Sequence, residues 1–223
     1  MIAFISDIHG NLPALKAVLG RIDALGCTKT VCLGDVAGYY PQVNECISLL
    51  REREIPSLLG NHDYYLISNT CCSSKTVKIC LEYQKTILSA ENLNWLKGNS
   101  PSLDGETYSL RHGGWQDALE ERFSKFDFSW VADLPQRIFI SGHTHIQNCI
   151  VQEYGNRLYC NPGSVGQPRD GDPRAAFAVW DEKETILLQR VPYDIDEVVH
   201  QMNKAGLGEW IWKGLYTGTQ IGK

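Results

Sequence analysis

Apolar residues in the first sixty positions show two kinds of spacing. Short continuous apolar runs at residues 2–6, 30–33 and 57–59 are typical of buried strands. Between these runs, apolar residues recur every three or four positions, which predicts one helix that ends at Gly26 and a second that opens at Pro41. Their apolar faces carry Leu12, Leu15, Val18, Leu19, Ile22 and Leu25 in the first, and Val43, Cys46, Ile47 and Leu50 in the second. The alternation of strand and helix indicates an α/β fold whose central sheet is parallel in this part.

The middle of the chain is predicted to be mainly helical and its later part mainly strand. Residues 64–98 read as helical, with Ser89 as the cap of a short helix that holds Leu93 and Leu96. Two further strands are expected at residues 108–111 and 137–141.

The last third of the chain alternates strands with turns. Strands at 149–154 and 157–160, separated by a Gly-Asn turn, form a hairpin signal. Strands at 175–180 and 186–191 are expected to continue the same sheet across a polar turn at 181–183. Asp194 and Glu197 form a capping box for a closing helix, and the glycine-containing tail after Trp212 is expected to be partly loose. We expect one domain over residues 1–223.

Five short polar segments follow predicted strands and hold five of the six histidines. They are Asp7-Ile8-His9-Gly10-Asn11, Gly34-Asp35, Gly60-Asn61-His62-Asp63, His112-Gly113 and Gly142-His143-Thr144-His145. Ligands gather at the carboxyl ends of strands in open α/β sheets, so we expect these segments to meet in one cleft.

The bulk properties narrow the class of protein. A net charge of −5 and an isoelectric point near 5.7 argue against stable nucleic-acid binding, which needs a basic surface. No apolar run is long enough to span a bilayer, and the N-terminus is too quickly acidic for a signal peptide. The eight cysteines lack a Cys-x-x-Cys pair, which favours reduced thiols and a cytoplasmic protein.

The candidate ligands form a mixed oxygen and nitrogen set without thiolate. They are Asp7, His9, Asp35, Asn61, His112, His143 and His145. Such a set suits borderline divalent ions such as Mn, Fe, Zn, Co or Ni. Seven side chains are too many for one open catalytic ion, but they suit two ions that share a carboxylate. Two divalent ions less two carboxylate charges leave about two positive charges, which matches a phosphate ester attacked by a bridging hydroxide.

With these motifs, the sequence resembles the calcineurin-like metallophosphoesterase superfamily, and within it the compact bacterial and archaeal phosphoesterase and phosphodiesterase branch. The resemblance covers roughly residues 1–170. It implies an α/β sandwich of two mixed β-sheets packed together and flanked by helices. It also implies a hydrolase with two divalent transition metal ions, manganese favoured, that acts on a small phosphoester.

The resemblance also implies a role for each candidate residue. Asp7, His9 and His145 would hold the first ion, and Asn61, His112 and His143 would hold the second. Asp35 would bridge the two. His62 would lie beside the substrate and protonate the leaving oxygen or stabilise transition-state charge, and Asp63 would orient its imidazole.

Several assignments leave an alternative open. Asn11 either contacts substrate or only caps the helix that follows it, and Asp63 is otherwise a loop-forming residue. Arg169 contacts the phosphate, or its loop is only a tight connection between strands. The alternatives for function are a phosphoprotein phosphatase and a non-catalytic scaffold of the same fold. The natural substrate, the native metal and the oligomeric state stay open.

Overall fold

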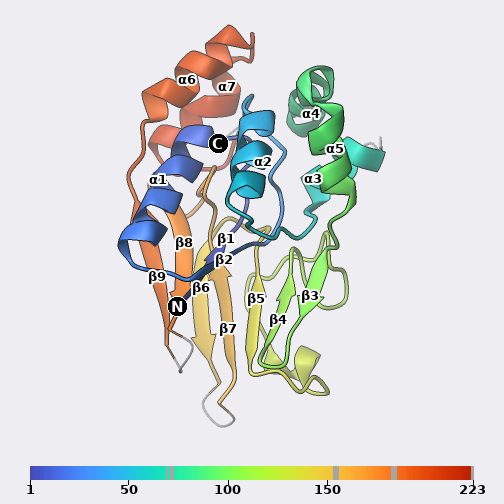
Figure 1. Ribbon diagram of the computed structural model, residues 1–223, viewed down its shortest axis with the longest axis vertical. Coiled ribbons are helices and arrows are strands. Elements are labelled where there is room, and N and C mark those ends of the chain that lie inside the picture. Colours follow the sequence, from blue (N-terminus) through green and yellow to red (C-terminus); the bar gives the residue numbers. More distant parts are fainter. Residues whose placement is uncertain (69, 71–72, 153–155, 182–184, 222–223) are drawn as a thin grey trace.

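The computed structural model describes residues 1–68, 70, 73–152, 156–181 and 185–221 and contains two β-sheets (Figure 1). The first sheet has the order β2-β1-β8-β9, and its strands are β1 (Ile2–Ile5), β2 (Lys29–Cys32), β8 (Ala175–Trp180) and β9 (Ile186–Val191). The second has the order β3-β4-β5-β7-β6, and its strands are β3 (Ser102–Asp104), β4 (Tyr108–Arg111), β5 (Ile138–Ser141), β6 (Gln147–Val151) and β7 (Leu158–Pro162). Both sheets contain parallel and antiparallel pairs. The predicted fold class, two mixed sheets in an α/β protein, is confirmed.

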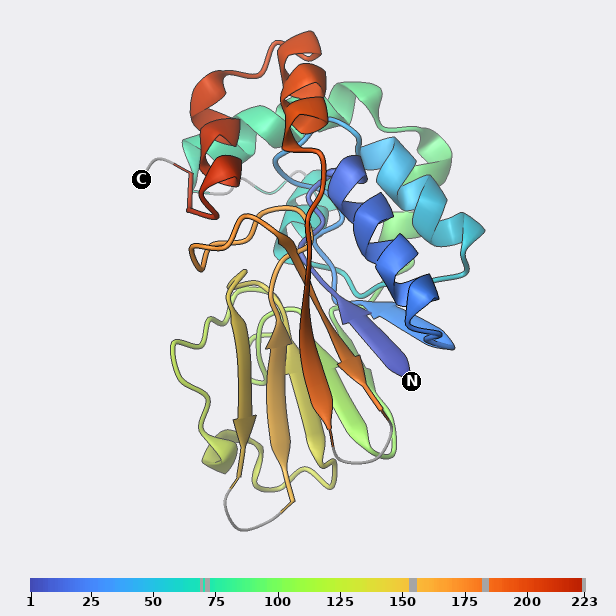
Figure 2. The ribbon, with the colours of Figure 1, turned by 90° about the vertical axis from the view of Figure 1, so that its left-hand side faces the viewer.

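Most helices gather at one end of the molecule, and the second sheet extends to the other end (Figures 1 and 2). The α-helices are α1 (Leu12–Ala24), α2 (Val43–Glu52), α3 (Asn61–Ser68), α4 (Lys75–Ile87), α5 (Ala90–Lys97), α6 (Ile195–Lys204) and α7 (Glu209–Trp212). Two 3₁₀ helices are η1 (Phe128–Val131) and η2 (Lys213–Tyr216). Within the described residues, no helix is long and apolar enough to cross a membrane.

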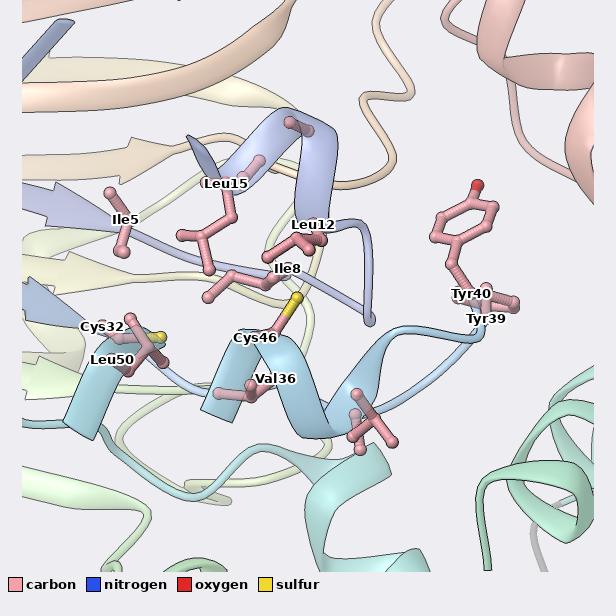
Figure 3. Packing of buried hydrophobic residues seen from close by; sticks show 14 of the residues in the cluster. Ile5, Ile8, Leu12, Leu15, Cys32, Val36, Tyr39, Tyr40, Cys46 and Leu50 are labelled. Atoms are coloured by element: carbon pink, nitrogen blue, oxygen red, sulfur yellow. The ribbon is translucent and has the colours of Figure 1, made fainter. Parts of the chain in front are cut away.

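The two-residue period of β1 divides its side chains between two cores. Ile2 and Phe4 face the second sheet, in a cluster that includes Leu110 and Ile140. Ala3 and Ile5 face the helices instead. Figure 3 shows this helix-side core, where residues of α1 and α2 surround the chain that leaves β1 and β2. Burial on both faces of β1 holds the residues that follow it in place, and those residues are the first candidate ligands.

Three local predictions were wrong. Residues 57–59 do not form a strand, since their pairing with the sheet is a single parallel bridge between Cys32 and Ser57. The second helix begins at Val43, with Gln42 as its N-cap, so Pro41 lies ahead of it. Strands β8 and β9 join the first sheet, whereas the hairpin before them lies in the second. In the tail after Trp212, the first four residues form η2, and the expected looseness of the tail stays a prediction.

The remaining local predictions agree with the structure where it describes the chain. Ser89 caps α5, and Asp194 caps α6 by accepting a hydrogen bond from the backbone N–H of Glu197. Strands β6 and β7 form the predicted antiparallel hairpin, although part of its turn, including Gly155, lies outside the described residues. The turn at 181–183 also lies partly outside them. Strand β3 was not predicted, because three residues give too short a pattern to recognise.

Candidate metal centre

The candidate ligands converge where the two sheets meet the helices. Asp7 and His9 follow β1, Asp35 follows β2, His112 follows β4, and His143 and His145 follow β5, while Asn61 is the first residue of α3. All seven side chains are buried, each exposing 3% or less of its surface. The expected convergence is present, but the ligands come from both sheets rather than from one sheet edge.

The backbone at the centre is strained. Five of the seven candidate ligands have a positive φ, namely Asp7, His9, Asp35, His143 and His145, with values from 54° to 66°. Left-handed backbone is costly for residues other than glycine, and it persists only where the surrounding structure imposes it. Such strain concentrated on one set of polar residues is typical of a functional site.

Two glycines allow the ligand segments to pack this closely. A Cβ at Gly60 would lie 2.0 Å from Oδ1 of Asp35, and a Cβ at Gly38 would lie 2.0 Å from Nδ1 of His9. Both distances are far below van der Waals contact. A side chain at either position would therefore displace a candidate ligand.

The first group of ligands consists of Asp7, His9 and His145. The Nε2 atoms of His9 and His145 lie 3.0 Å apart. Oδ1 of Asp7 lies 3.4 Å from Nε2 of His145 and 4.0 Å from Nε2 of His9. Ligand atoms bound to one ion at about 2.1 Å, and roughly at right angles, are separated by about 3.0 Å. The spacing in this group fits a shared ion.

The tautomers of both histidines support the same interpretation. Nδ1 of His9 donates a hydrogen bond to the carbonyl of Ala37 at 2.9 Å, and Nδ1 of His145 donates to the carbonyl of Gln167 at 2.7 Å. A carbonyl only accepts, so the proton of each neutral ring is on Nδ1 and each Nε2 carries a lone pair. Two lone pairs that face each other at 3.0 Å repel unless a cation lies between them.

The second group consists of Asp35, His112 and His143, with Asn61 beside them. Nε2 of His112 lies 3.5 Å from Oδ2 of Asp35 and 3.1 Å from Oδ1 of Asn61. Nδ1 of His112 donates to the carbonyl of Leu33 at 2.9 Å, which leaves its Nε2 as an acceptor, as in the first group. Oδ2 of Asp35 is also 3.7 Å from Nε2 of His9, so this carboxylate reaches both groups.

Several buried polar atoms of the centre lack a partner in the part of the chain that the structure describes. They include Oδ1 of Asp7, Nε2 of His143 and Nδ1 of His62. Buried polar groups without partners cost free energy, so native proteins rarely retain them without a reason. Bound cations would satisfy Asp7 and His143. The donor set, its spacing and these orphaned atoms together fit a divalent metal centre.

Burial also opposes charge on the ligands in the absence of a cation. Burial raises the pKa of Asp7. Burial also raises the pKa of Asp35, and the negative charges of the nearby Asp63 and Asp7 raise it further. Burial lowers the pKa of His9, His143 and His145 well below its usual range. The protein alone therefore favours neutral histidines, the form in which imidazole binds a metal.

The predicted pairing of Asp63 with His62 is wrong. The carboxylate of Asp63 accepts hydrogen bonds from the backbone N–H groups of Val36, Ala37 and Gly60 at 3.3, 2.7 and 3.0 Å. It therefore ties the loop after Asp35 to the start of α3. The His62 imidazole instead packs against the rings of His9 and Tyr39, with centroids 4.7 and 5.0 Å away. The loop-forming alternative describes Asp63.

The structure gives Asn11 and Arg169 different surroundings. Asn11 is the N-cap of α1: its Oδ1 accepts from the N–H of Ala14, and its Nδ2 donates to the carbonyl of Gly166. The oxygen and the nitrogen of its side-chain amide thus each have a hydrogen-bond partner. A substrate contact by Asn11 stays a prediction. Arg169 lies beside the centre, because its backbone N–H donates to the carbonyl of His145 at 3.2 Å.

Sequence reasoning missed Glu120. Its carboxylate accepts hydrogen bonds from the hydroxyl of Tyr65 and from Nδ2 of Asn61, the latter at 3.5 Å. The contact holds the Asn61 amide with its Oδ1 toward His112. Glu120 lies in an irregular loop eight positions after His112, and no spacing pattern in the sequence connects it to Asn61.

Comparison with known proteins gives a consistent result. Residues 1–185 match the family model of the calcineurin-like phosphoesterase superfamily domain. The chain is 34% identical to protein MJ0912 of Methanocaldococcus jannaschii, over 98% of both chains. It is 26% identical to the phosphodiesterase YfcE of Escherichia coli K12, over 80% of this chain and 85% of that one. The crystal structure of a metallophosphoesterase from Sphaerobacter thermophilus is similar, with a TM-score of 0.85, 30% identity and 98% coverage of both chains.

Proposed function

This chain belongs to the calcineurin-like phosphoesterase superfamily and is a metal-dependent phosphoester hydrolase, and we propose that it uses two divalent ions to cleave a small phosphodiester. Membership gives the reaction class. The number of ions, their identity and the substrate are the proposal. The observation that carries it is the pair of Nε2 lone pairs of His9 and His145, which face each other at 3.0 Å with both Nδ1 protons already donated to carbonyls.

The ligand positions support two sites. Asp7, His9 and His145 would hold one ion, and Asn61, His112 and His143 the other. Asp35 is the candidate bridge, because its Oδ2 lies within 3.7 Å of a histidine Nε2 from each set. The mixed oxygen and nitrogen donors suit Mn, Fe, Zn, Co or Ni. Manganese is proposed as the first ion to test because the family resemblance favours it.

The ions, when bound, would lower the pKa of water and neutralise the charge of the phosphate. The protein contributes position and charge compensation. Three backbone carbonyls, those of Ala37, Leu33 and Gln167, orient the imidazoles of His9, His112 and His145. Hydrogen bonds to the second nitrogen of a ligating histidine fix its tautomer and orientation.

His62 is proposed to act on the leaving group. Its Nε2 lies 4.0 Å from Oδ2 of Asp35, so the imidazole stands at the edge of the ligand cluster. Its Nδ1 has no hydrogen-bond partner among the described residues. In this place a neutral imidazole can donate a hydrogen bond to the oxygen on which charge develops, and a protonated one can donate a proton to it.

The reaction is proposed to be a single in-line displacement by water. Asp7 and Asp35 face the histidine nitrogens, which leaves their oxygens poorly placed to attack phosphorus. A covalent route would need a serine or cysteine beside a dedicated base, and the five polar segments hold no such pair. One displacement inverts the configuration at phosphorus.

The similarity to YfcE, a phosphodiesterase, supports a diester as the first substrate to test. We expect protein loaded with Mn²⁺ to hydrolyse bis(p-nitrophenyl) phosphate with a steady-state rate that chelation abolishes and Mn²⁺ restores. His145→Ala, which removes one ligand, serves as the inactive control. Absence of turnover on diesters and on p-nitrophenyl phosphate with every one of the five metals would contradict the proposed function.

A further inference from the structure

A cavity of about 480 Å³ lies beside the metal centre. Four separate parts of the chain line it: the loop between β4 and β5, the segment after His143, the loop after β7 and the C-terminal tail. The lining residues are Arg122, Phe123, Ser124, Thr144, Ile146, Arg169, Thr219 and Gln220. None of these is acidic, although the whole chain carries a net charge of −5.

The cavity is lined by immediate neighbours of the candidate ligands. Thr144 stands between His143 and His145 in the sequence and lines the cavity. Arg169 links it to the first ligand group, because its Nη2 donates to the hydroxyl of Tyr39, whose ring packs on His9 with centroids 4.8 Å apart. A molecule with one end on the metal ligands can therefore extend into this cavity.

Two guanidinium groups give the cavity its charge. Arg169 is held by Gln167, which accepts from its Nε at 3.0 Å and from its Nη2 at 2.6 Å, so the group is fixed in place. Arg122 is exposed and makes no hydrogen bond or ion pair within the described part of the chain. An arginine that has no acidic partner and lines a cavity without carboxylates is available to an anion.

Both arginines lie beside the candidate site. Arg122 lines the same cavity as Thr144, which stands between the candidate ligands His143 and His145 in the sequence. The backbone N–H of Arg169 donates to the carbonyl of His145 at 3.2 Å. An anionic molecule that enters the cavity therefore meets both guanidinium groups.

The walls of the cavity are built into the fold. The loop before Arg122 is held by Glu121, whose carboxylate accepts from the N–H groups of Gln116 and Asp117. The tail is docked on the loop after Arg169, because the N–H of Gly171 donates to the carbonyl of Gly218 at 3.0 Å (Figure 2).

The C-terminal tail contributes to this cavity residues that lie outside the domain matched by the family model. Thr219 and Gln220 lie beyond residues 1–185, the part of the chain that matches the superfamily model. One wall is thus made by residues outside the common domain. Members of a superfamily differ in the substrates they select, and an added wall of this kind can provide such selectivity.

We propose that this cavity is a subsite for a second phosphate group of the substrate, held by Arg122 and Arg169 beside the phosphate that is hydrolysed. Arginine recognises phosphate through paired N–H donors, which Arg122 can supply. Arg169 adds its positive charge, because its Nε and Nη2 already donate to Gln167 and Tyr39. The hydroxyls of Ser124, Thr144 and Thr219 supply further donors. The apolar faces of Phe123 and Ile146 contact the organic part. The substrate class is a small organic molecule with two phosphates. This inference rests on the proposed function, since it places the reacting phosphate at the ligand cluster.

The test compares adenosine 5′-diphosphate with adenosine 5′-monophosphate, which differ by one phosphate. Each competes against bis(p-nitrophenyl) phosphate with the wild-type protein at fixed free Mn²⁺. We expect the diphosphate to inhibit at least about tenfold more strongly, because its second phosphate gains charge-assisted hydrogen bonds in the cavity. Arg122→Gln should reduce this ratio to below about twofold, and Arg122→Lys should retain part of it.

Lys125→Gln is the matched control. It removes one positive charge from the same loop, but Lys125 lines a different cavity with Phe128 and Trp130. The wild-type ratio should persist in this variant. A ratio near one in the wild type, or an unchanged ratio in Arg122→Gln, would overturn the subsite. If the diester is not hydrolysed at all, the proposed function fails, and calorimetric titration of the two nucleotides still measures the ratio.

Discussion

The ligand cluster and the two-arginine cavity lie side by side but are built in different ways. The cluster is made of buried side chains that directly follow strands or begin a helix, and five of its seven residues have strained backbone. The cavity is lined by irregular segments and the C-terminal tail, and Arg122 within it is exposed. Strand ends buried between two cores can hold several ligands in fixed positions. Loops and tails can change without disturbing these positions. The proposed chemistry therefore depends on buried strand ends, and the proposed choice of substrate depends on loops and the tail.

The largest effect is expected from Asp35→Ala, because its carboxylate reaches both ligand groups. The variant should lose both ions and all measurable hydrolysis. Metal analysis of the purified protein, by atomic emission, gives the stoichiometry. Asn61→Ala is the companion variant, and it should mainly weaken one site. Equal metal loss in the two variants would show that Asp35 does not bridge.

A smaller loss of activity is expected from His62→Gln. This variant should keep two ions, because His62 is not needed as a ligand, yet turnover should fall by about 10² to 10⁴. The loss should be smaller for esters with a good leaving group such as p-nitrophenolate than for alkyl esters. Steady-state rates on both kinds of ester measure this difference. An undiminished rate on an alkyl ester would remove His62 from the reaction, and a loss of metal would make it a ligand.

Metal removal should destabilise the cluster while it leaves the fold in place. Chelation leaves Asp7 and His143 with unsatisfied buried atoms and removes a binding free energy of about 2.7 kcal/mol per site at 100 times the dissociation constant. We expect the melting temperature to fall by about 5 °C or more. Asp35→Ala should not respond to the chelator, since it holds no ions. A wild-type melting temperature that is independent of metal would mean that the cluster is satisfied without it.

The smallest effect is expected from a change in the loop that carries Arg122. A Cβ at Gly114 would lie 2.1 Å from Oε2 of Glu121 and 2.5 Å from Cζ of Phe123. Gly114→Ala should therefore shift the loop and weaken the preference for a second phosphate about threefold, with the metal content unchanged. Gly20→Ala, where a Cβ meets nothing within 4 Å, is the control. If Gly114→Ala lost metal as well, the cluster and the cavity would not be separable.

The sequence predicted the cluster because its residues have a local signature. Each polar segment except the one at Asn61 follows a described strand. The sequence shows an apolar run at each of these strands, β1, β2, β4 and β5. The strand expected at 57–59 failed because only one bridge forms there, yet Asn61 still reaches the cluster through the first turn of α3. The apolar runs and their order along the chain were thus sufficient to predict which polar segments meet in the cluster.

Contacts between loops that are distant in the sequence could not be predicted from local sequence patterns. Asp63 follows His62 directly, which suggested a pair, but the three backbone N–H groups of the two neighbouring turns attract its carboxylate more effectively. Glu120 and Arg122 lie in a loop without periodic pattern, and their proximity to the centre depends on how that loop folds. The assignment of β8 and β9 to the other sheet likewise depends on long-range pairing, here with β1.

The most direct test of two ions bridged by Asp35 is an anomalous difference map from crystals grown with Mn²⁺. The account predicts two peaks about 3.5 Å apart. One should be bound by Asp7, His9 and His145 and the other by Asn61, His112 and His143, with the Asp35 carboxylate on both. A single peak at full occupancy, with the side chains of His112 and His143 bound to no ion, would contradict it.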